Sequence, residues 1–93
     1  MHIVVAYDIV DNRRRNLLAK ILLDYGIRVQ KSVFECRIDE QHYLKMKAAI
    51  EKAIDHNEDS VRYYFLCKRC ASNIEVSGWG PIHDEDENDV IIV

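Results

Sequence analysis

The order of apolar segments along this chain constrains its fold more than any other feature of the sequence. A short, continuously apolar and β-branched run at residues 3–7 is typical of a central strand buried on both faces. Apolar residues then recur at steps of three and four between Leu17 and Tyr25, which indicates an amphipathic helix. Asp11 can cap the start of this helix, and Gly26 stands where a left-handed residue usually ends one. The chain therefore begins with a strand and a helix.

The alternation continues in the middle of the chain. Residues 27–39 predict two short strands joined by a tight turn near Lys31 and Ser32, although one bent strand would fit the same residues. Asp39 can cap a second helix, whose apolar positions lie between residues 43 and 54.

Two further strands are predicted at residues 60–67 and 73–81, the second one short and closed by glycines and Pro81. The order strand, helix, strand, strand, helix, strand within 93 residues is typical of the α+β ferredoxin-like plait (βαββαβ), whose two helices lie on one face of an antiparallel sheet. We therefore assign residues 1–80 to a ferredoxin-like domain and residues 81–93 to an acidic linker and an extra C-terminal strand.

The last five residues, DVIIV at 89–93, form an apolar, β-branched end beyond the acidic segment. Such an end should pair with a sheet edge rather than stay in water. The edge can belong to the same chain or to a neighbouring copy, and exchange between two copies would produce a swapped homodimer.

Composition excludes several classes of protein. No segment approaches the roughly 20 apolar residues of a membrane span, and the N-terminus lacks the basic start and long apolar block of a signal peptide. We therefore expect a cytoplasmic protein with no membrane partner. The odd number of cysteines, three, favours free thiols. Cys67 and Cys70 have metal-ligand spacing, but the second pair that a structural zinc site needs is missing.

Charge is distributed unevenly along the chain. Residues 13–37 contain seven basic side chains against two acids, whereas residues 84–89 contain five acids. Without these five acids the formal net charge of −3 would become +2. A polyanionic partner is therefore compatible with the basic flank, and the acidic run is most simply a solvated linker.

Asp8 is the main candidate for chemistry, because it ends an apolar run at the turn into the first helix. Asp8 and Asp11 would both lie near the positive end of that helix, where carboxylates could hold Mg²⁺ or Mn²⁺. The alternative is that Asp11 is only a helix cap and Asp8 a surface acid. One acid per subunit is too few for a two-metal site, but a two-fold axis near Asp8 would bring two copies around one ion.

Cationic and aromatic side chains near this turn could contact nucleic acid. The three successive arginines must point in different directions from a helix, so they cannot all address one phosphate. Phe34 can be a core residue or a stacking surface. The candidate nucleic-acid contacts are Arg13, Arg14, Arg15, Arg28 and Lys31.

The stretches YDIVDNRRR at 7–15 and LLDYGIRVQKSVFECRI at 22–38 closely resemble the CRISPR-associated protein Two family. The resemblance implies a ferredoxin-like plait that forms a homodimer and exchanges its terminal strand between the two copies. It also implies a partner of the CRISPR integrase, often described as a metal-dependent endonuclease or endoribonuclease. It also implies that Asp8, the acid after the tyrosine of the first strand, is a metal ligand. The other positions that it marks as important are Tyr7, Arg15, Arg28, Ser32 and Phe34.

From residues and resemblance together, we expect a spacer-acquisition protein in which Asp8 is catalytic and binds Mg²⁺ or Mn²⁺ at the dimer axis. The basic side chains would hold the phosphates of single-stranded RNA or duplex DNA, while Tyr7, Ser32 and Phe34 support the site. The alternative is a non-catalytic dimer that bridges two integrase dimers and holds duplex DNA, for which Asp8 would be dispensable.

Overall fold

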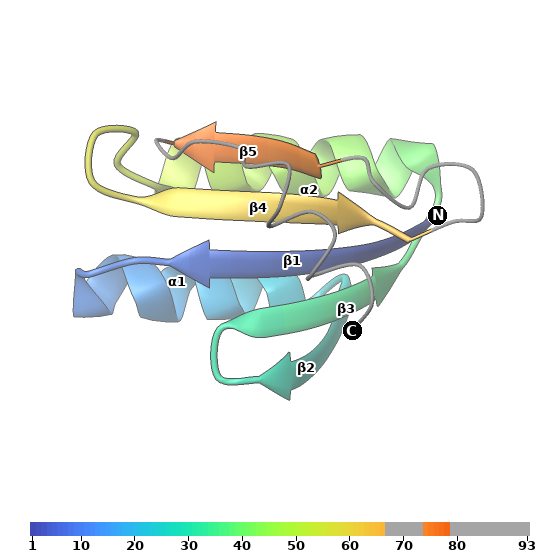
Figure 1. The fold of residues 1–93 in the computed structure, drawn as a ribbon, viewed down its shortest axis with the longest axis horizontal. Coiled ribbons are helices and arrows are strands. Elements are labelled where there is room, and N and C mark those ends of the chain that lie inside the picture. Colours follow the sequence, from blue (N-terminus) through green and yellow to red (C-terminus); the bar gives the residue numbers. More distant parts are fainter. Residues whose placement is uncertain (67–73, 79–93) are drawn as a thin grey trace.

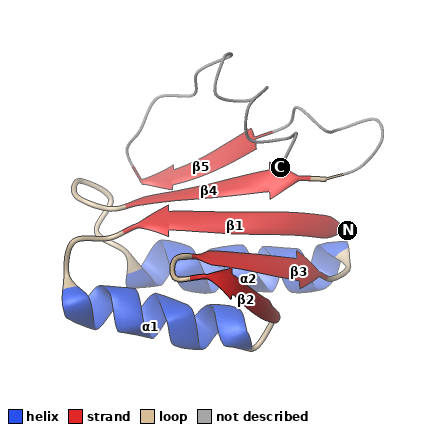
Figure 2. Ribbon diagram, turned by 60° about the horizontal axis from the view of Figure 1, so that its bottom comes forward, coloured by secondary structure: helices blue, strands red, loops and turns tan. Residues whose placement is uncertain are grey.

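The structure is a computed structural model that describes residues 1–66 and 74–78 of the chain. Five strands form one antiparallel sheet in the order β2-β3-β1-β4-β5, and both helices cover the same face (Figure 1, Figure 2). This arrangement confirms the predicted ferredoxin-like plait. The elements are β1 (His2–Asp8), α1 (Asn12–Leu23), β2 (Gly26–Gln30), β3 (Val33–Arg37), α2 (Glu40–Ala53), β4 (Ser60–Phe65) and β5 (Ile74–Gly78).

Three sequence predictions lie outside the described residues. They are the acidic run, the DVIIV end and the Cys67–Cys70 pair. The boundary after residue 80 and the pairing of the terminal strand therefore stay predictions. No helix in the described part of the chain is long and apolar enough to cross a membrane.

β1 is the central strand, as predicted, but it is not buried on both faces. Ile3, Val5 and Tyr7 are buried, whereas Val4 and Ala6 between them are half-buried. Successive side chains of a strand point to opposite faces, and the helices cover only one face of this sheet. The continuous apolar run therefore serves one deep core face and one more open face.

The core lies between the sheet and the two helices. Leu18 and Leu22 of α1 and Met46 and Ile50 of α2 are fully buried against the inward side chains of the strands. Phe34 is also fully buried, which decides its role in favour of the core.

The thiol of Cys36 is free and buried among these core residues. Burial raises the pKa of the Cys36 thiol to about 11, because the charged thiolate would be desolvated there. Cys36 is therefore a core residue without nucleophilic reactivity at neutral pH.

Both predicted helix caps are present. Asp11 accepts a hydrogen bond from the backbone N–H of Arg14 (2.9 Å), and Asp39 accepts one from the N–H of His42 (2.8 Å). Each bond favours the ionised carboxylate and so lowers the pKa of its acid. The caps fix the start of each helix directly after a strand.

The prediction for Gly26 is wrong in its physical reason. α1 ends at Leu23, and among the described residues only Gly78 has a positive φ, so Gly26 is not a left-handed terminator. Gly26 begins β2, where a Cβ atom would lie 2.3 Å from the carbonyl oxygen of Glu35 and 2.6 Å from Sγ of Cys36. The glycine is needed because β3 passes too close for a side chain.

We predict that Gly26→Ala destabilises the protein by about 2 kcal/mol, because backbone must move to admit the methyl group. Urea unfolding measures the loss. Gly26→Asn distinguishes the two explanations, since a left-handed position would tolerate asparagine better than alanine. Close approach predicts a loss at least as large for asparagine, and a nearly wild-type Gly26→Asn protein would contradict it.

Candidate metal and nucleic-acid site

Asp8 is exposed at the end of the central strand, beyond the last residue of β1 that is in register with β3. The pairing of β1 with β3 ends at Ala6 opposite Val33, followed by one bond from the Tyr7 N–H to the Ser32 carbonyl (3.0 Å). On the other side, Asp8 lies opposite Ser60, the first residue of β4. Because Tyr7 points into the core, strand alternation directs the Asp8 carboxylate to the face away from the helices.

The described residues of one chain do not assemble a closed metal site around this carboxylate. No group of three or more His, Cys, Asp or Glu side chains comes together in the described ranges 1–66 and 74–78. Asp11 serves as a helix cap through its Oδ2 atom. Asp8 fits the way in which proteins often hold Mg²⁺, through one or two carboxylates completed by water and substrate phosphates.

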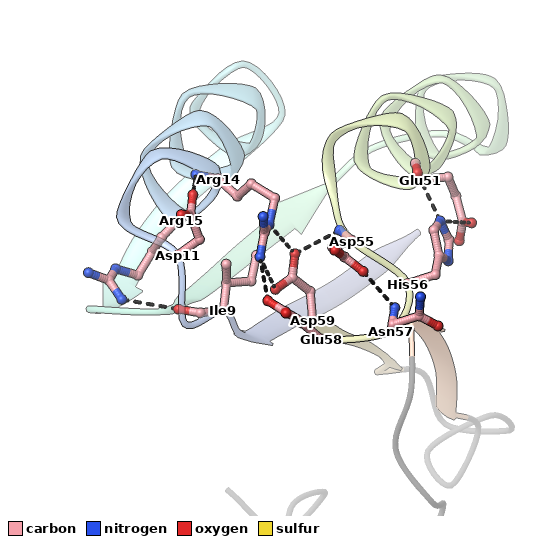
Figure 3. Close-up of polar contacts among 10 residues, drawn as sticks. All are labelled: Ile9, Asp11, Arg14, Arg15, Glu51, Asp55, His56, Asn57, Glu58 and Asp59. Carbon is pink, nitrogen blue, oxygen red and sulfur yellow. Dashed lines mark hydrogen bonds and ion pairs between the residues drawn. The ribbon is translucent and has the colours of Figure 1, made fainter.

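Arg14 of the arginine triplet is directed inward, between α1 and α2 (Figure 3). Its Nε–H donates to Oδ2 of Asp59 (2.7 Å) and its Nη2 to Oδ1 (3.3 Å), while Nη2 also lies 3.2 Å from Glu58. The hydrogen bond to Asp59 raises the pKa of Arg14 further. Arg14 therefore neutralises a buried acid, which corrects its assignment as a phosphate contact.

Arg15 points to the other side of the helix (Figure 3) and holds the turn that follows Asp8. Its Nη1 donates to the carbonyl oxygen of Ile9 (3.0 Å), and its Nη2 contacts the side chain of Asn12. Arg13 is exposed. The three arginines thus diverge as predicted, and each has a different environment.

The predicted supporting residues lie together around Phe34. Tyr7 stacks on Phe34 with ring centroids 6.3 Å apart, and the Arg28 guanidinium lies 5.2 Å from the centre of the same ring. The Tyr7 hydroxyl donates a long bond to the Lys31 carbonyl (3.4 Å), and Ser32 contributes its carbonyl to β1. Arg28 and Lys31 are both exposed.

Sequence reasoning missed Asp59, the fully buried acid that binds Arg14. Asp59 also accepts the N–H of Asp55 (2.8 Å), and its own N–H donates to the Asp55 carbonyl (2.8 Å). The segment DHNEDS has the composition of a solvated turn, so the pattern carries no sign of which acid is buried. The only available signal was the excess of basic residues in the first turn of α1.

We predict that Arg14→Ala lowers the Tm by roughly 10 °C, because it leaves the Asp59 carboxylate buried without its cation. Arg13→Ala is the matched control one residue away and should change the Tm by less than about 3 °C, since Arg13 is exposed. A cycle with Asp59→Ala should show strong non-additivity. Equal Tm losses for Arg14→Ala and Arg13→Ala would contradict a stabilising role of the Arg14–Asp59 ion pair.

Similarity to known proteins places this chain among CRISPR-associated proteins. A "CRISPR-associated endoribonuclease Cas2 1" of Chloroflexus aurantiacus is 37% identical over 94 residues, covering 100% of both chains. A "CRISPR-associated endonuclease Cas2 2" of Thermus thermophilus is 40% identical and covers 94% of this chain and 92% of its own.

The fold agrees with these relatives. The crystal structure of Streptococcus pyogenes Cas2 superposes with a TM-score of 0.69 at 37% identity, covering 73% of this chain and 88% of that chain. Residues 1–74 match the family described as "CRISPR associated protein Cas2". With the plait and the exposed acid at the end of its first strand, this match shows that the chain belongs to the Cas2 family.

Proposed function

We propose that this protein is a divalent-metal-dependent endonuclease of CRISPR spacer acquisition, acting on phosphodiesters of RNA or DNA. The observation that carries the proposal is the exposed Asp8 carboxylate at the end of the central strand, just before the turn into the helix that carries the exposed Arg13. Relatives in the family bear the names endoribonuclease and endonuclease, which supports the reaction class.

In this proposal the active form of the protein is a homodimer. Each chain offers one exposed carboxylate at this turn, and Mg²⁺ or Mn²⁺ bound there would be shared by Asp8 of two copies. Val4, Ala6 and Val33 are half-buried on the sheet face opposite the helices, which gives a second copy an apolar surface to cover. A dimer would also allow the terminal strand to pair in trans.

When bound in the proposed site, Mg²⁺ or Mn²⁺ would supply positive charge to the phosphodiester and would lower the pKa of a water. Asp8 would hold such an ion through its carboxylate. Arg13, Arg28 and Lys31 bind backbone phosphates, and Arg28 is oriented for this by its stack on Phe34. Binding of this kind depends strongly on salt and little on base sequence.

A second candidate is a bridging dimer without nuclease activity, which holds duplex DNA between integrase subunits. Among the described residues, no group of three or more potential metal ligands comes together. This favours the second candidate, because two-metal nucleases use several acids. Both candidate functions use the same exposed cations to bind nucleic acid, so an assay of cleavage is needed to distinguish them.

We predict that Asp8→Asn abolishes metal-dependent cleavage while leaving nucleic-acid binding intact, since it removes a charged ligand with little change of shape. The assay follows labelled single-stranded RNA and duplex DNA in Mg²⁺ and in EDTA, with binding measured on the same samples. Asp24→Asn is the control, because Asp24 is an exposed acid at the far end of α1.

Cleavage by the Asp8→Asn protein at the wild-type rate would contradict the metal-ligand role of Asp8. If wild type and Asp8→Asn bind duplex DNA equally and neither cuts any substrate, the bridging role becomes the better explanation.

Removal of the stacked and neighbouring cations gives a separate prediction. Arg28→Ala and Lys31→Ala should each reduce the slope of log Kd against log salt by about 0.7 to 0.9, the contribution of one neutralised phosphate. Lys45→Ala on α2 serves as the control, because Lys45 is exposed on the opposite half of the molecule. An equal change of slope in all three variants would contradict the prediction, because it would mean that nucleic acid does not bind preferentially at Arg28 and Lys31.

A further inference from the structure

Asp8 is held in place by a closed circuit of contacts that includes residues far from it in sequence. From Asp8 the chain runs through the turn at residues 9–11 into the first turn of α1, which carries Arg14. Arg14 binds Asp59, and the next residue, Ser60, lies opposite Asp8 in the sheet. The circuit thus returns to Asp8 through one ion pair and one strand pairing.

The circuit matters because, in the described part of the sheet, strand pairing reaches Asp8 from one side only. Register with β3 ends at Ala6, so among the described strands only β4 pairs with Asp8. The position of the Asp8 backbone therefore depends on where β4 begins. That start is set by Asp59, whose side chain and N–H are both bonded.

The position of Asp59 is restrained by burial and by several hydrogen bonds. It is fully buried, and its carboxylate accepts hydrogen bonds from Nε and Nη2 of Arg14 and from the N–H of Asp55. A bidentate guanidinium contact fixes direction as well as distance, which a lysine ammonium cannot reproduce. Figure 3 shows this contact between the start of α1 and the turn after α2.

The strand beyond β4 approaches the same point. Gly78 of β5 lies opposite Ser60, and a Cβ atom there would meet the carbonyl oxygen of Asp59 at 2.0 Å. Three segments, the start of α1, the turn before β4 and the end of β5, are therefore packed on Asp59. A displacement of Asp59 would move the neighbour of Asp8.

From this geometry we infer that Arg14 and Asp59 are positioning residues, which set the placement of the Asp8 carboxylate for the reaction. The inference rests on the proposed nuclease function of Asp8. It assigns a role in the active site to the turn between α2 and β4, which contributes no group to the chemistry itself. Partners that orient a metal-binding carboxylate typically affect metal affinity or activity 10- to 100-fold.

We call the Arg14–Asp59 pair the clamp. The test compares the two clamp variants, Arg14→Lys and Asp59→Asn, with Met46→Ala in full-length protein. The first two keep the size of the side chains but break the bidentate contact, and Arg14→Lys keeps the charge. Met46→Ala destabilises the core near Cys36, at the other end of β1. All three are assayed well below their Tm values, so that loss of folded protein is not measured as loss of activity.

For Arg14→Lys and Asp59→Asn we expect kcat to fall and the Mn²⁺ concentration for half-saturation to rise, each by about 10- to 100-fold. KM for the nucleic acid should stay unchanged. Mn²⁺ binding is followed by electron paramagnetic resonance without substrate. Met46→Ala should keep wild-type kcat and Mn²⁺ binding. Wild-type values in both clamp variants, or an equal loss in Met46→Ala, would overturn the inference.

Native-state hydrogen exchange separates this inference from the proposed function. Amides at the Asp8–Ser60 end of the β1–β4 ladder should lose protection selectively in the two clamp variants and not in Met46→Ala. If wild type neither cuts nor binds Mn²⁺, the proposed function fails, while the exchange result still decides whether the clamp places Asp8. Unchanged protection at this end would overturn the positioning role.

Discussion

The candidate site depends on the alternation of side chains along β1. Ile3, Val5 and Tyr7 face the helices, and the same alternation directs Asp8 outward at the end of the strand. A slip of one residue would turn the carboxylate into the core and expose Tyr7. The core that holds the fold together therefore also fixes the side of the sheet on which the acid appears.

The arginine triplet shows how adjacent identical residues acquire different roles. Helix geometry separates their directions, and the surroundings of each direction decide what the side chain does. Arg14 meets a buried acid, Arg15 meets the carbonyl of Ile9, and Arg13 meets solvent. Arg15 thus holds the turn that follows Asp8, whereas Arg14 neutralises the buried Asp59.

The sequence predicted the fold well because periodicity and caps are local signals. Asp11 and Asp39 could be identified as caps from their positions alone, and the structure confirms both. The requirement for Gly26 and the burial of Asp59 could not be predicted, because both arise from segments distant in sequence. Gly26 depends on the approach of β3, and Asp59 on an arginine 45 residues away.

The stoichiometry of Mn²⁺ binding tests the central claim, that Asp8 is a metal ligand completed by a second copy of the chain. Titration of the purified protein, followed by electron paramagnetic resonance with the oligomeric state measured on the same sample, counts the ions per chain. If two Asp8 carboxylates share one Mn²⁺ ion, the titration gives one ion per two chains. The Asp8→Asn protein should then bind no Mn²⁺. A dimer that still binds Mn²⁺ with wild-type affinity after Asp8→Asn would contradict the claim.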